Sequence, residues 1–124
     1  MSTPCRTLIV DDDADMAYLA MATVEVANDG LVVSGVALNG TEAMEKLHDA
    51  DVVVLDFRMP GRNGLDVASD ILATKPDQAI VLFSAYLDDA TVTAAEQLGI
   101  RACVSKDRIR DLPDVIRRYC PNAA

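Results

Sequence analysis

The chain of 124 residues contains no apolar run that approaches the roughly 20 residues needed to span a bilayer. It also lacks the apolar segment of a signal peptide near its amino terminus, so we expect a cytoplasmic protein that does not bind a membrane. Basic residues are few, because 11 lysines and arginines stand against 20 acidic residues and give a net charge of −9. Since phosphate backbones bind to basic surfaces, this charge argues against nucleic-acid binding by this domain.

Cysteine and histidine are also scarce. Cys5, Cys103 and Cys120 are an odd number, lie far apart and form no C-x-x-C pair. We therefore expect three free thiols, and neither a disulfide framework nor a zinc site. The single histidine, His48, lies near the end of an acidic predicted helix, where a surface or capping role is favoured over phosphotransfer.

The composition is that of a globular protein, with 51% hydrophobic and 25% charged residues. A chain of this length buries well over half of the surface that its unfolded form exposes. We expect one domain over residues 1–124, because the sequence shows no internal repeat, no low-complexity segment and no linker.

Five short apolar runs predict strands, and apolar residues at helical spacing between and after them predict five helices. The strands are expected at residues 7–10, 31–37, 52–56, 78–84 and 101–106. The first helix is predicted to end at residues 28–30 and to turn one face to the core, made of Met16, Leu19, Ala20, Thr23, Val24 and Ala27. The last helix is predicted to have Pro113 in its first turn and a core face of Leu112, Val115, Ile116 and Tyr119.

Strands and helices thus alternate, with short connections throughout. This alternation is typical of an α/β fold with a doubly wound parallel sheet. In such a sheet the carboxyl ends of all strands lie at one edge, where ligands bind. The strands of this chain end there in a small set of reactive residues: Asp11, Asp12, Asp13, Asp56, Ser84 and Lys106.

Acids gathered at one edge repel each other, and the pKa of each rises unless a cation is present. The arrangement therefore implies a divalent metal ion or a site that Lys106 neutralises, and oxygen ligands favour Mg²⁺ or Mn²⁺. The metal ion, the Ser84 hydroxyl and the Lys106 ammonium would together stabilise the oxygens of a transferring phosphoryl group. One carboxylate would remain to act as the nucleophile. The sequence thus predicts that an aspartyl phosphate forms.

Four motifs resemble the response-regulator receiver domain of bacterial two-component systems. They are residues 8–13 (LIVDDD), residues 51–64 (DVVVLDFRMPGRNG), residues 80–86 (IVLFSAY) and Lys106, and the resemblance extends from Thr7 to about Tyr119. It implies a flavodoxin-like strand order of 2-1-3-4-5 in a five-stranded parallel sheet, with five helices on both faces.

The resemblance also implies a metal site and a phosphoacceptor. Asp56 would accept the phosphoryl group, and Asp11 and Asp12 would hold Mg²⁺ together with the Asp56 carboxylate and the backbone carbonyl of Arg58. Mn²⁺ is a possible substitute.

Further roles follow from the same resemblance. Ser84 and Lys106 would each bond a phosphoryl oxygen, completing a catalytic set with Asp56. The donor would be a sensor histidine kinase or a phosphotransfer protein, sometimes replaced by a small acyl phosphate. The chain would catalyse only its own phosphorylation and dephosphorylation. Phosphorylation would shift the surface of the fourth helix, fifth strand and fifth helix, which would contact a downstream protein or a second copy of the chain.

Two positions depart from the family pattern. Cys103 stands where the family usually has Tyr or Phe, a ring that turns inward on activation, so the usual aromatic switch is missing. Asp107 follows Lys106 where Pro is usual, as in the branch of the family that commonly carries a helix-turn-helix output domain. Arg58 and Tyr86 lie at the rim of the predicted site, and we expect them to tune the lifetime of the phosphorylated form.

Two alternatives stay open. In a phosphohydrolase of the haloacid-dehalogenase type, Asp11 would be the nucleophile, although Asp15 stands where such enzymes prefer Thr or Val. An interaction module of the same fold would take no phosphate, although the intact set of acids, hydroxyl and lysine argues against it. A flavodoxin-like cofactor binder would need a Ser-, Thr- and Gly-rich loop after the first strand, and the three acids there exclude it.

Overall fold

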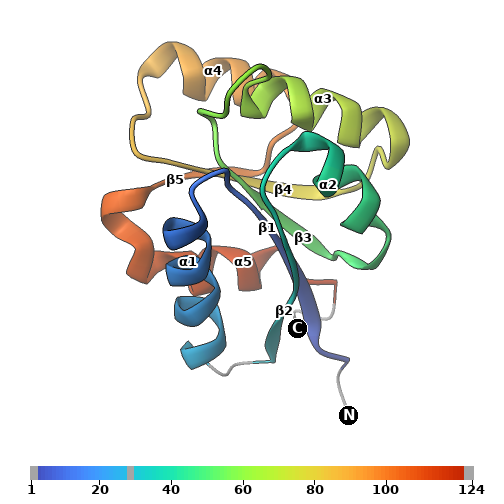
Figure 1. Cartoon of the computed structure of the whole chain (residues 1–124), viewed down its shortest axis with the longest axis vertical. Coiled ribbons are helices and arrows are strands. Elements are labelled where there is room, and N and C mark those ends of the chain that lie inside the picture. The colour runs from blue at the N-terminus through green and yellow to red at the C-terminus, as the bar shows by residue number, and fades with distance from the viewer. Residues whose placement is uncertain (1–2, 28–29, 122–124) are drawn as a thin grey trace.

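A computed structural model describes residues 3–27 and 30–121 (Figure 1). Five parallel strands form one sheet in the order β2-β1-β3-β4-β5. They are β1 (Cys5–Val10), β2 (Leu31–Ala37), β3 (Val52–Leu55), β4 (Ala79–Ser84) and β5 (Ala102–Ser105). The predicted fold class and strand order are confirmed.

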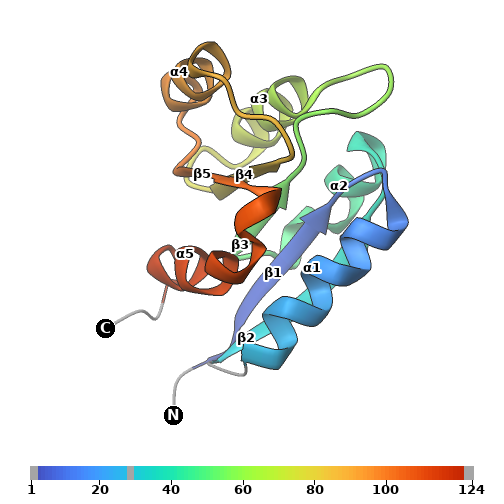
Figure 2. The same cartoon turned by 90° about the vertical axis from the view of Figure 1, so that its left-hand side faces the viewer.

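Five α-helices cover both faces of this sheet, as Figures 1 and 2 show. They are α1 (Ala14–Ala27), α2 (Gly40–Lys46), α3 (Gly64–Thr74), α4 (Asp89–Leu98) and α5 (Leu112–Arg118). Two short 3₁₀ helices, η1 (Leu47–Asp49) and η2 (Lys106–Asp111), precede β3 and α5. Helices α1 and α5 lie on one face, and α2, α3 and α4 lie on the other.

The central strand β3 shows why its sequence is apolar without alternation. Successive side chains of a strand point to opposite faces. Val52 and Val54 pack in the core beneath α1 and α5, whereas Val53 and Leu55 pack in the core beneath α2, α3 and α4. All four side chains are buried, so β3 is fixed from both sides directly before Asp56.

The core face of α1 differs from the prediction. Ala17, Ala20 and Val24 are buried, whereas Leu19, predicted in the core, is 51% exposed. The helix is apolar on nearly every side, so two stripes of apolar residues competed in the sequence pattern. Small alanines let the helix pack closely on the sheet, and this contact selects the stripe of Ala17 and Ala20. The predicted stop falls partly on residues 28–29, which lie outside the described residues.

The last helix is shorter than predicted. Leu112 and Ile116 are buried and Pro113 lies in the first turn, as predicted, but α5 ends at Arg118. Tyr119 follows the helix, and its hydroxyl donates a hydrogen bond to the carbonyl of Arg101 at 3.2 Å.

The prediction of three free thiols is wrong for two of them. Cys5 and Cys120 form a disulfide across a separation of 115 residues, with their Cα atoms 5.7 Å apart, and Cys103 is the free cysteine. Cys5 begins β1, and Cys120 lies just past the end of α5. The fold brings these two ends together beneath one face of the sheet, and such tertiary proximity leaves no trace in cysteine spacing.

Within residues 3–27 and 30–121, every helix is too short or too polar to cross a membrane.

Candidate functional site

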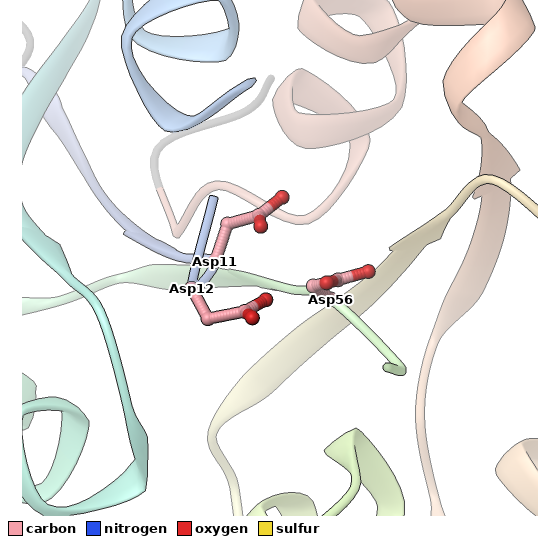
Figure 3. A group of neighbouring side chains, drawn as sticks. All are labelled: Asp11, Asp12 and Asp56. Atoms are coloured by element: carbon pink, nitrogen blue, oxygen red, sulfur yellow. The ribbon is translucent and has the colours of Figure 1, made fainter. Parts of the chain in front are cut away.

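The sheet places two of the predicted acids side by side at its carboxyl edge. The N–H of Asp11 donates to the carbonyl of Ala37 at 3.0 Å, and the N–H of Asp56 donates to the carbonyl of Val10 at 2.9 Å. These bonds continue the strand pairing past the ends of β1 and β3. Asp12 follows on the loop after β1 and turns its carboxylate toward the same space (Figure 3).

The carboxylates of Asp11, Asp12 and Asp56 form a candidate metal site. Each offers one oxygen, and these oxygens lie within 4.8 Å of one another. Asp11 and Asp56 are buried, with 2% and 4% exposure, whereas Asp12 is exposed. Three hard oxygen donors around one space, open to solvent at Asp12, match the preference of Mg²⁺ and Mn²⁺.

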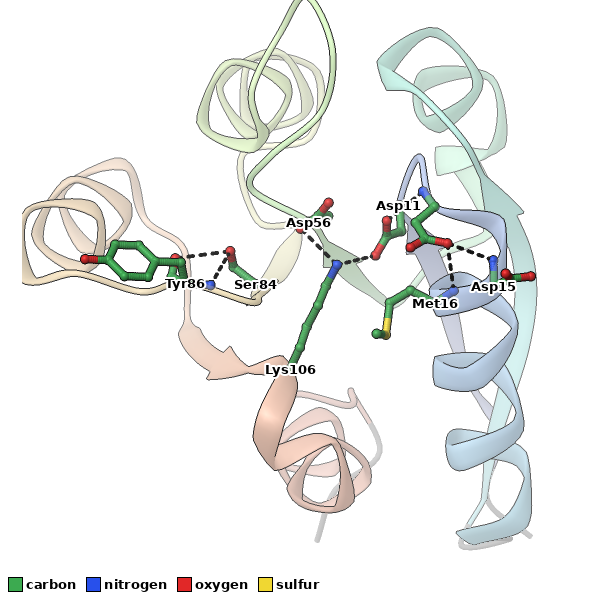
Figure 4. Close-up of polar contacts among 8 residues, drawn as sticks. Asp11, Asp15, Met16, Asp56, Ser84, Tyr86 and Lys106 are labelled. Carbon is green, nitrogen blue, oxygen red and sulfur yellow. Dashed lines mark hydrogen bonds and ion pairs between the residues drawn. The ribbon is translucent and has the colours of Figure 1, made fainter.

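Lys106 lies between the two buried acids, as Figure 4 shows. Its ammonium donates a hydrogen bond to Asp11 Oδ2 at 2.8 Å and lies 3.3 Å from Asp56 Oδ1. Burial lowers the pKa of Lys106, but the hydrogen bond to Asp11 and the charge of Asp56 outweigh burial, so the pKa lies above its ordinary value. Lys106 is therefore a fixed positive charge within the acidic cluster.

One ammonium does not neutralise the cluster. Burial, followed by repulsion from Asp11, raises the pKa of Asp56 from 3.8 to about 6, although Lys106 acts in the opposite direction. The charge of Asp12 adds to the rise. Ionised Asp56 is thus disfavoured mainly by burial and secondly by its acidic neighbours, and a divalent cation bound to the cluster would favour the ionised form. The residues present fit such an ion by both donor type and charge.

The third acid of the triplet has a different position. Asp13 Oδ1 accepts hydrogen bonds from the N–H groups of Asp15 at 3.0 Å and Met16 at 3.3 Å. Asp13 thereby caps the first turn of α1. Its own N–H donates to Asp11 Oδ1 at 2.9 Å, so both oxygens of Asp11 are engaged, one by Asp13 and one by Lys106.

Ser84 ends β4 and is buried, but its hydroxyl is bonded to its own loop. It donates to the carbonyl of Tyr86 at 3.2 Å and accepts from the N–H of Tyr86 at 3.4 Å (Figure 4). The structure therefore brings Ser84 to the predicted edge of the sheet, where its hydroxyl forms hydrogen bonds with the backbone of Tyr86.

Two residues at the rim contact each other. The Arg58 guanidinium carbon lies 5.8 Å from the centre of the Tyr86 ring, a cation–π distance. Arg58 follows Asp56 by two positions, and Tyr86 follows Ser84 by two. The contact joins the loop after β3 to the loop after β4.

Gly64 is a site residue that reasoning from the sequence missed. A Cβ atom at this position would lie 2.3 Å from the carbonyl oxygen of Asp56 and 2.9 Å from the Cα of Phe57. The N–H of Gly64 donates to the carbonyl of Phe57 at 2.7 Å. The start of α3 thus packs directly on the backbone of Asp56, and only glycine permits this approach. The glycines of residues 60–64 were visible in the sequence, but which of them makes a close contact was not.

Gly64→Ala is expected to lower the free energy of unfolding by about 1 to 3 kcal/mol, because its methyl group displaces the backbone of Asp56. Urea unfolding measures the loss. The matched control is Gly61→Ala, since Gly61 has a φ of 83° but nothing within 4 Å of its Cβ position, and its cost is backbone strain of about 1 kcal/mol. A shift of the Asp56 amide resonance is expected for Gly64→Ala and not for the control. Equal losses with an unmoved Asp56 resonance would contradict the role of close packing.

Cys103 lies on β5, half-buried against the core beneath α2, α3 and α4. Burial, with a smaller effect from Glu96, raises the pKa of its thiol, so the thiol is neutral at physiological pH. Residue 103, where the family usually has Tyr or Phe, thus carries a small neutral side chain.

Fold and site together define a class of protein: a doubly wound α/β domain of order 2-1-3-4-5 with clustered acids and a lysine at the carboxyl edge of its sheet. The chain belongs to the response regulator receiver domain family, whose model matches residues 7–117. The resemblance drawn from the sequence motifs is confirmed, and with it the assignment to two-component signalling.

The curated relatives include a protein of similar length to this chain and proteins that are much longer. The chemotaxis protein CheY of Thermotoga maritima is 36% identical over 103 residues, which cover 82% of this chain and 84% of that protein. Protein-glutamate methylesterase/protein-glutamine glutaminase 1 of Rhizobium johnstonii is 37% identical over 109 residues, which cover 86% of this chain but 31% of that protein. The chain therefore spans about a third of the length of the methylesterase.

Solved structures agree. The signal receiver domain of the response regulator NarL from Mycobacterium tuberculosis has a TM-score of 0.81 and 28% identity, over 94% of this chain and 98% of that one. The response regulator domain of Thermotoga maritima CheB has a TM-score of 0.84 at 24% identity, over 94% and 96% of the two chains, and this likeness concerns the fold.

Proposed function

We propose that the chain is a phosphoacceptor that takes a phosphoryl group onto Asp56 and returns it to water. The observation that carries this proposal is the ion-paired cluster at the carboxyl edge of the sheet, where Lys106 lies 2.8 Å from Asp11 and 3.3 Å from Asp56. We assign Asp56 as the nucleophile of this cluster, because both carboxylate oxygens of Asp11 already accept hydrogen bonds, one from Asp13 and one from Lys106.

The transfer needs an ionised nucleophile and positive charge beside the oxygens of the phosphoryl group. An Asp56 oxygen attacks the phosphorus, a new O–P bond forms, and the bond from phosphorus to the donor nitrogen or acyl oxygen breaks. Lys106 is already held beside Asp56 and supplies charge to a phosphoryl oxygen. Asp11 positions this ammonium, so little rearrangement is needed at the moment of transfer.

The acids also form the proposed metal site. Asp11, Asp12 and Asp56, with the backbone carbonyl of Arg58, would hold Mg²⁺ or Mn²⁺. The ion would supply positive charge to the phosphoryl oxygens and lower the pKa of Asp56, which keeps the nucleophile ionised near neutral pH.

Ser84 is the proposed link from the site to the surface. To bond a phosphoryl oxygen on Asp56, its hydroxyl must leave the backbone of Tyr86, which frees the loop between β4 and α4. The phosphoryl dianion would bias this loop and Lys106 together, and so shift the surface of α4, β5 and α5 toward a downstream protein or a second copy of the chain. Cys103 on β5 means that this shift proceeds without the inward turn of an aromatic ring.

We propose a sensor histidine kinase or a phosphotransfer protein as the physiological donor, acting in the cytoplasm. The test uses a small acyl phosphate, acetyl phosphate, with Mg²⁺ and the purified chain. The added phosphoryl mass is expected on the peptide that contains Asp56, and borohydride reduction of the acyl phosphate marks the residue. Asp56→Asn should remove the signal, and Asp13→Asn, which keeps a capping side chain, should keep it.

The same experiment separates the alternatives. A phosphoryl label on Asp11 that persists in Asp56→Asn would support the haloacid-dehalogenase hypothesis, in which Asp11 is the nucleophile. Absence of label on a folded wild-type chain, with Mg²⁺ and with a panel of kinases, would support an interaction module that takes no phosphate. The buried carboxylate of Asp11, with a hydrogen bond to each of its oxygens, argues against Asp11 as the nucleophile.

Arg58 and Tyr86 are expected to slow hydrolysis of the phosphorylated form. Their contact joins the loops that follow Asp56 and Ser84, and we propose that it restricts the approach of water to a phosphoryl group on Asp56. Replacing both with Ala should speed dephosphorylation by about 3- to 10-fold, a change of roughly 1 kcal/mol in the barrier. The decay of label after removal of acetyl phosphate measures this rate. Leu87→Ala on the same loop is the control, and an unchanged decay in the double variant would refute the role of the contact.

A further inference from the structure

The disulfide between Cys5 and Cys120 lies far from the phosphoacceptor. Cys5 begins β1 and Asp11 follows the end of the same strand, so the bond and the acids lie at opposite edges of the sheet, about 20 Å apart along β1. The disulfide is therefore a site separate from the phosphoacceptor.

The two sulfurs differ in access. Cys5 is buried beneath the sheet, with 5% exposure, whereas Cys120 lies outside any helix and is partly exposed. Cys120 is therefore the more accessible residue of the pair, and a thiolate from solution that attacks its sulfur would expel the sulfur of Cys5. Persistent disulfides are uncommon inside cells, where pairs with an accessible sulfur exchange with the thiol pool.

The third cysteine does not compete in this exchange. Cys5 and Cys120 contact the core beneath α1 and α5, whereas Cys103 contacts the core on the other face of the sheet. The sheet separates Cys103 from the bond, so the pair has two states, one disulfide or two thiols, without a rearranged pairing.

Reduction would release a defined part of the chain. After α5 the backbone is held by the N–H of Tyr119 bonded to Ile116 at 3.0 Å and the N–H of Cys120 bonded to Arg117 at 3.3 Å, both within the same turn. The disulfide links this turn to β1, the hydroxyl of Tyr119 bonds the carbonyl of Arg101, and Tyr119 and Cys120 pack against the core beneath α1 and α5.

The chain next to the bond also shapes a cavity. Pro121 lines a cavity of about 400 Å³ at the amino-terminal edge of the sheet, together with residues 50–51 and 75–78. Because Pro121 follows Cys120 directly, the disulfide fixes this wall of the cavity.

We propose that Cys5 and Cys120 form a reversible thiol–disulfide staple, which holds the chain after α5 against the amino-terminal edge of the sheet and releases it on reduction by a low-molecular-weight thiol. The thiolate attacks the sulfur of Cys120, the bond between the two protein sulfurs breaks, and Cys5 leaves as a thiolate that takes a proton from water. A second thiol attacks the mixed disulfide, so that Cys120 is freed and the two small thiols leave as their own disulfide. Two electrons pass from the small thiols to the protein.

The test uses the purified chain in glutathione buffers of increasing ratio of reduced to oxidised form, with Cys103→Ser to leave two thiols to count. Alkylation followed by mass measurement should show a transition from no modified cysteine to two, without an intermediate plateau, while the chain stays folded. A chain with two reactive thiols at every ratio, or with none reactive in 10 mM reduced glutathione, would overturn the proposal.

Hydrogen exchange then measures the released segment. Amides of residues 117–120 should exchange at least 10-fold faster in the reduced chain, and those of β3 should be unchanged. Cys120→Ser should show the fast rate in both buffers and serves as the matched variant that cannot form the bond. Equal exchange at residues 117–120 in both states of the parent chain would refute a staple that controls this segment.

Discussion

Asp56→Asn is expected to make the metal-free protein more stable at pH 8 by about 2 to 3 kcal/mol, while it abolishes phosphorylation. The pKa of Asp56 rises from 3.8 to about 6 in the folded chain, because the carboxylate is buried and lies beside Asp11. Each unit of difference between folded and unfolded pKa corresponds to about 1.4 kcal/mol. Asn has nearly the same shape and carries no charge, so the variant avoids this cost.

The pH dependence has a definite sign. Since the folded pKa is the higher one, the folded wild-type chain binds more protons than the unfolded chain between pH 4 and pH 6, and its stability falls as the pH rises through about 6. The gain in the free energy of unfolding from Asp56→Asn should therefore reach its full value above pH 7 and should vanish near pH 4. Urea unfolding across this range measures it.

Two controls define the cause. Asp13→Asn removes one charge from the same loop but leaves the cluster and the helix cap intact, so it should lack this pH dependence. Mg²⁺ should stabilise the wild-type chain more than Asp56→Asn and so narrow the difference between them. A variant less stable than wild type at pH 8 would contradict the raised pKa of Asp56.

The gathering of the site could be predicted from the sequence, because it follows from one regularity. Parallel strands end at the same edge, so Asp11, Asp56 and Lys106 were expected together as soon as their strands were identified. The apolar runs of these strands are strong signals, since a strand buried on both faces tolerates few polar residues. Burial of β3 on both faces fixes the backbone that carries Asp56.

Other features depend on contacts that no local pattern encodes. The approach of Gly64 to the backbone of Asp56 arises from how α3 packs, and the bond between Cys5 and Cys120 from where the first strand and last helix meet. The exposed position of Leu19 has a similar origin, since periodicity cannot choose between two apolar stripes of one helix. The hydrogen bonds of Ser84 belong to one arrangement of a loop, and residue type alone does not specify them.

Lys106→Met is expected to be the most damaging single change at the site. The Lys106 side chain is 13% exposed, and its ammonium is the partner of two buried carboxylates. Removing it leaves Asp11 and Asp56 without a compensating charge, and loss of one partner of a buried ion pair costs about 3 to 5 kcal/mol. Methionine fills much the same volume as the lysine stem, so the loss is electrostatic. Phosphorylation should also fall strongly, because the phosphoryl oxygen loses its positive neighbour.

Conditions that remove charge from Asp56 should rescue this variant. The pKa of Asp56 in Lys106→Met should lie above its wild-type value of about 6, because the lysine lowers it, so the lost stability should be partly recovered as the pH falls from 8 to 5. The double variant Lys106→Met with Asp56→Asn should lose less stability than Lys106→Met alone, and Mg²⁺ should restore stability to the single variant. Urea unfolding at both pH values measures each effect.

Lys46→Met is the matched control, because Lys46 is about half exposed and bonds the carbonyl of Val36 outside the cluster. Its loss should be about 1 kcal/mol or less and should not depend on Asp56. If Lys106→Met were as stable as this control at pH 8, or if Asp56→Asn gave it no relief, the two acids would not depend on the lysine for their charge balance. The coupling between Lys106 and Asp56 is therefore the quantity that decides whether the cluster works as one electrostatic unit.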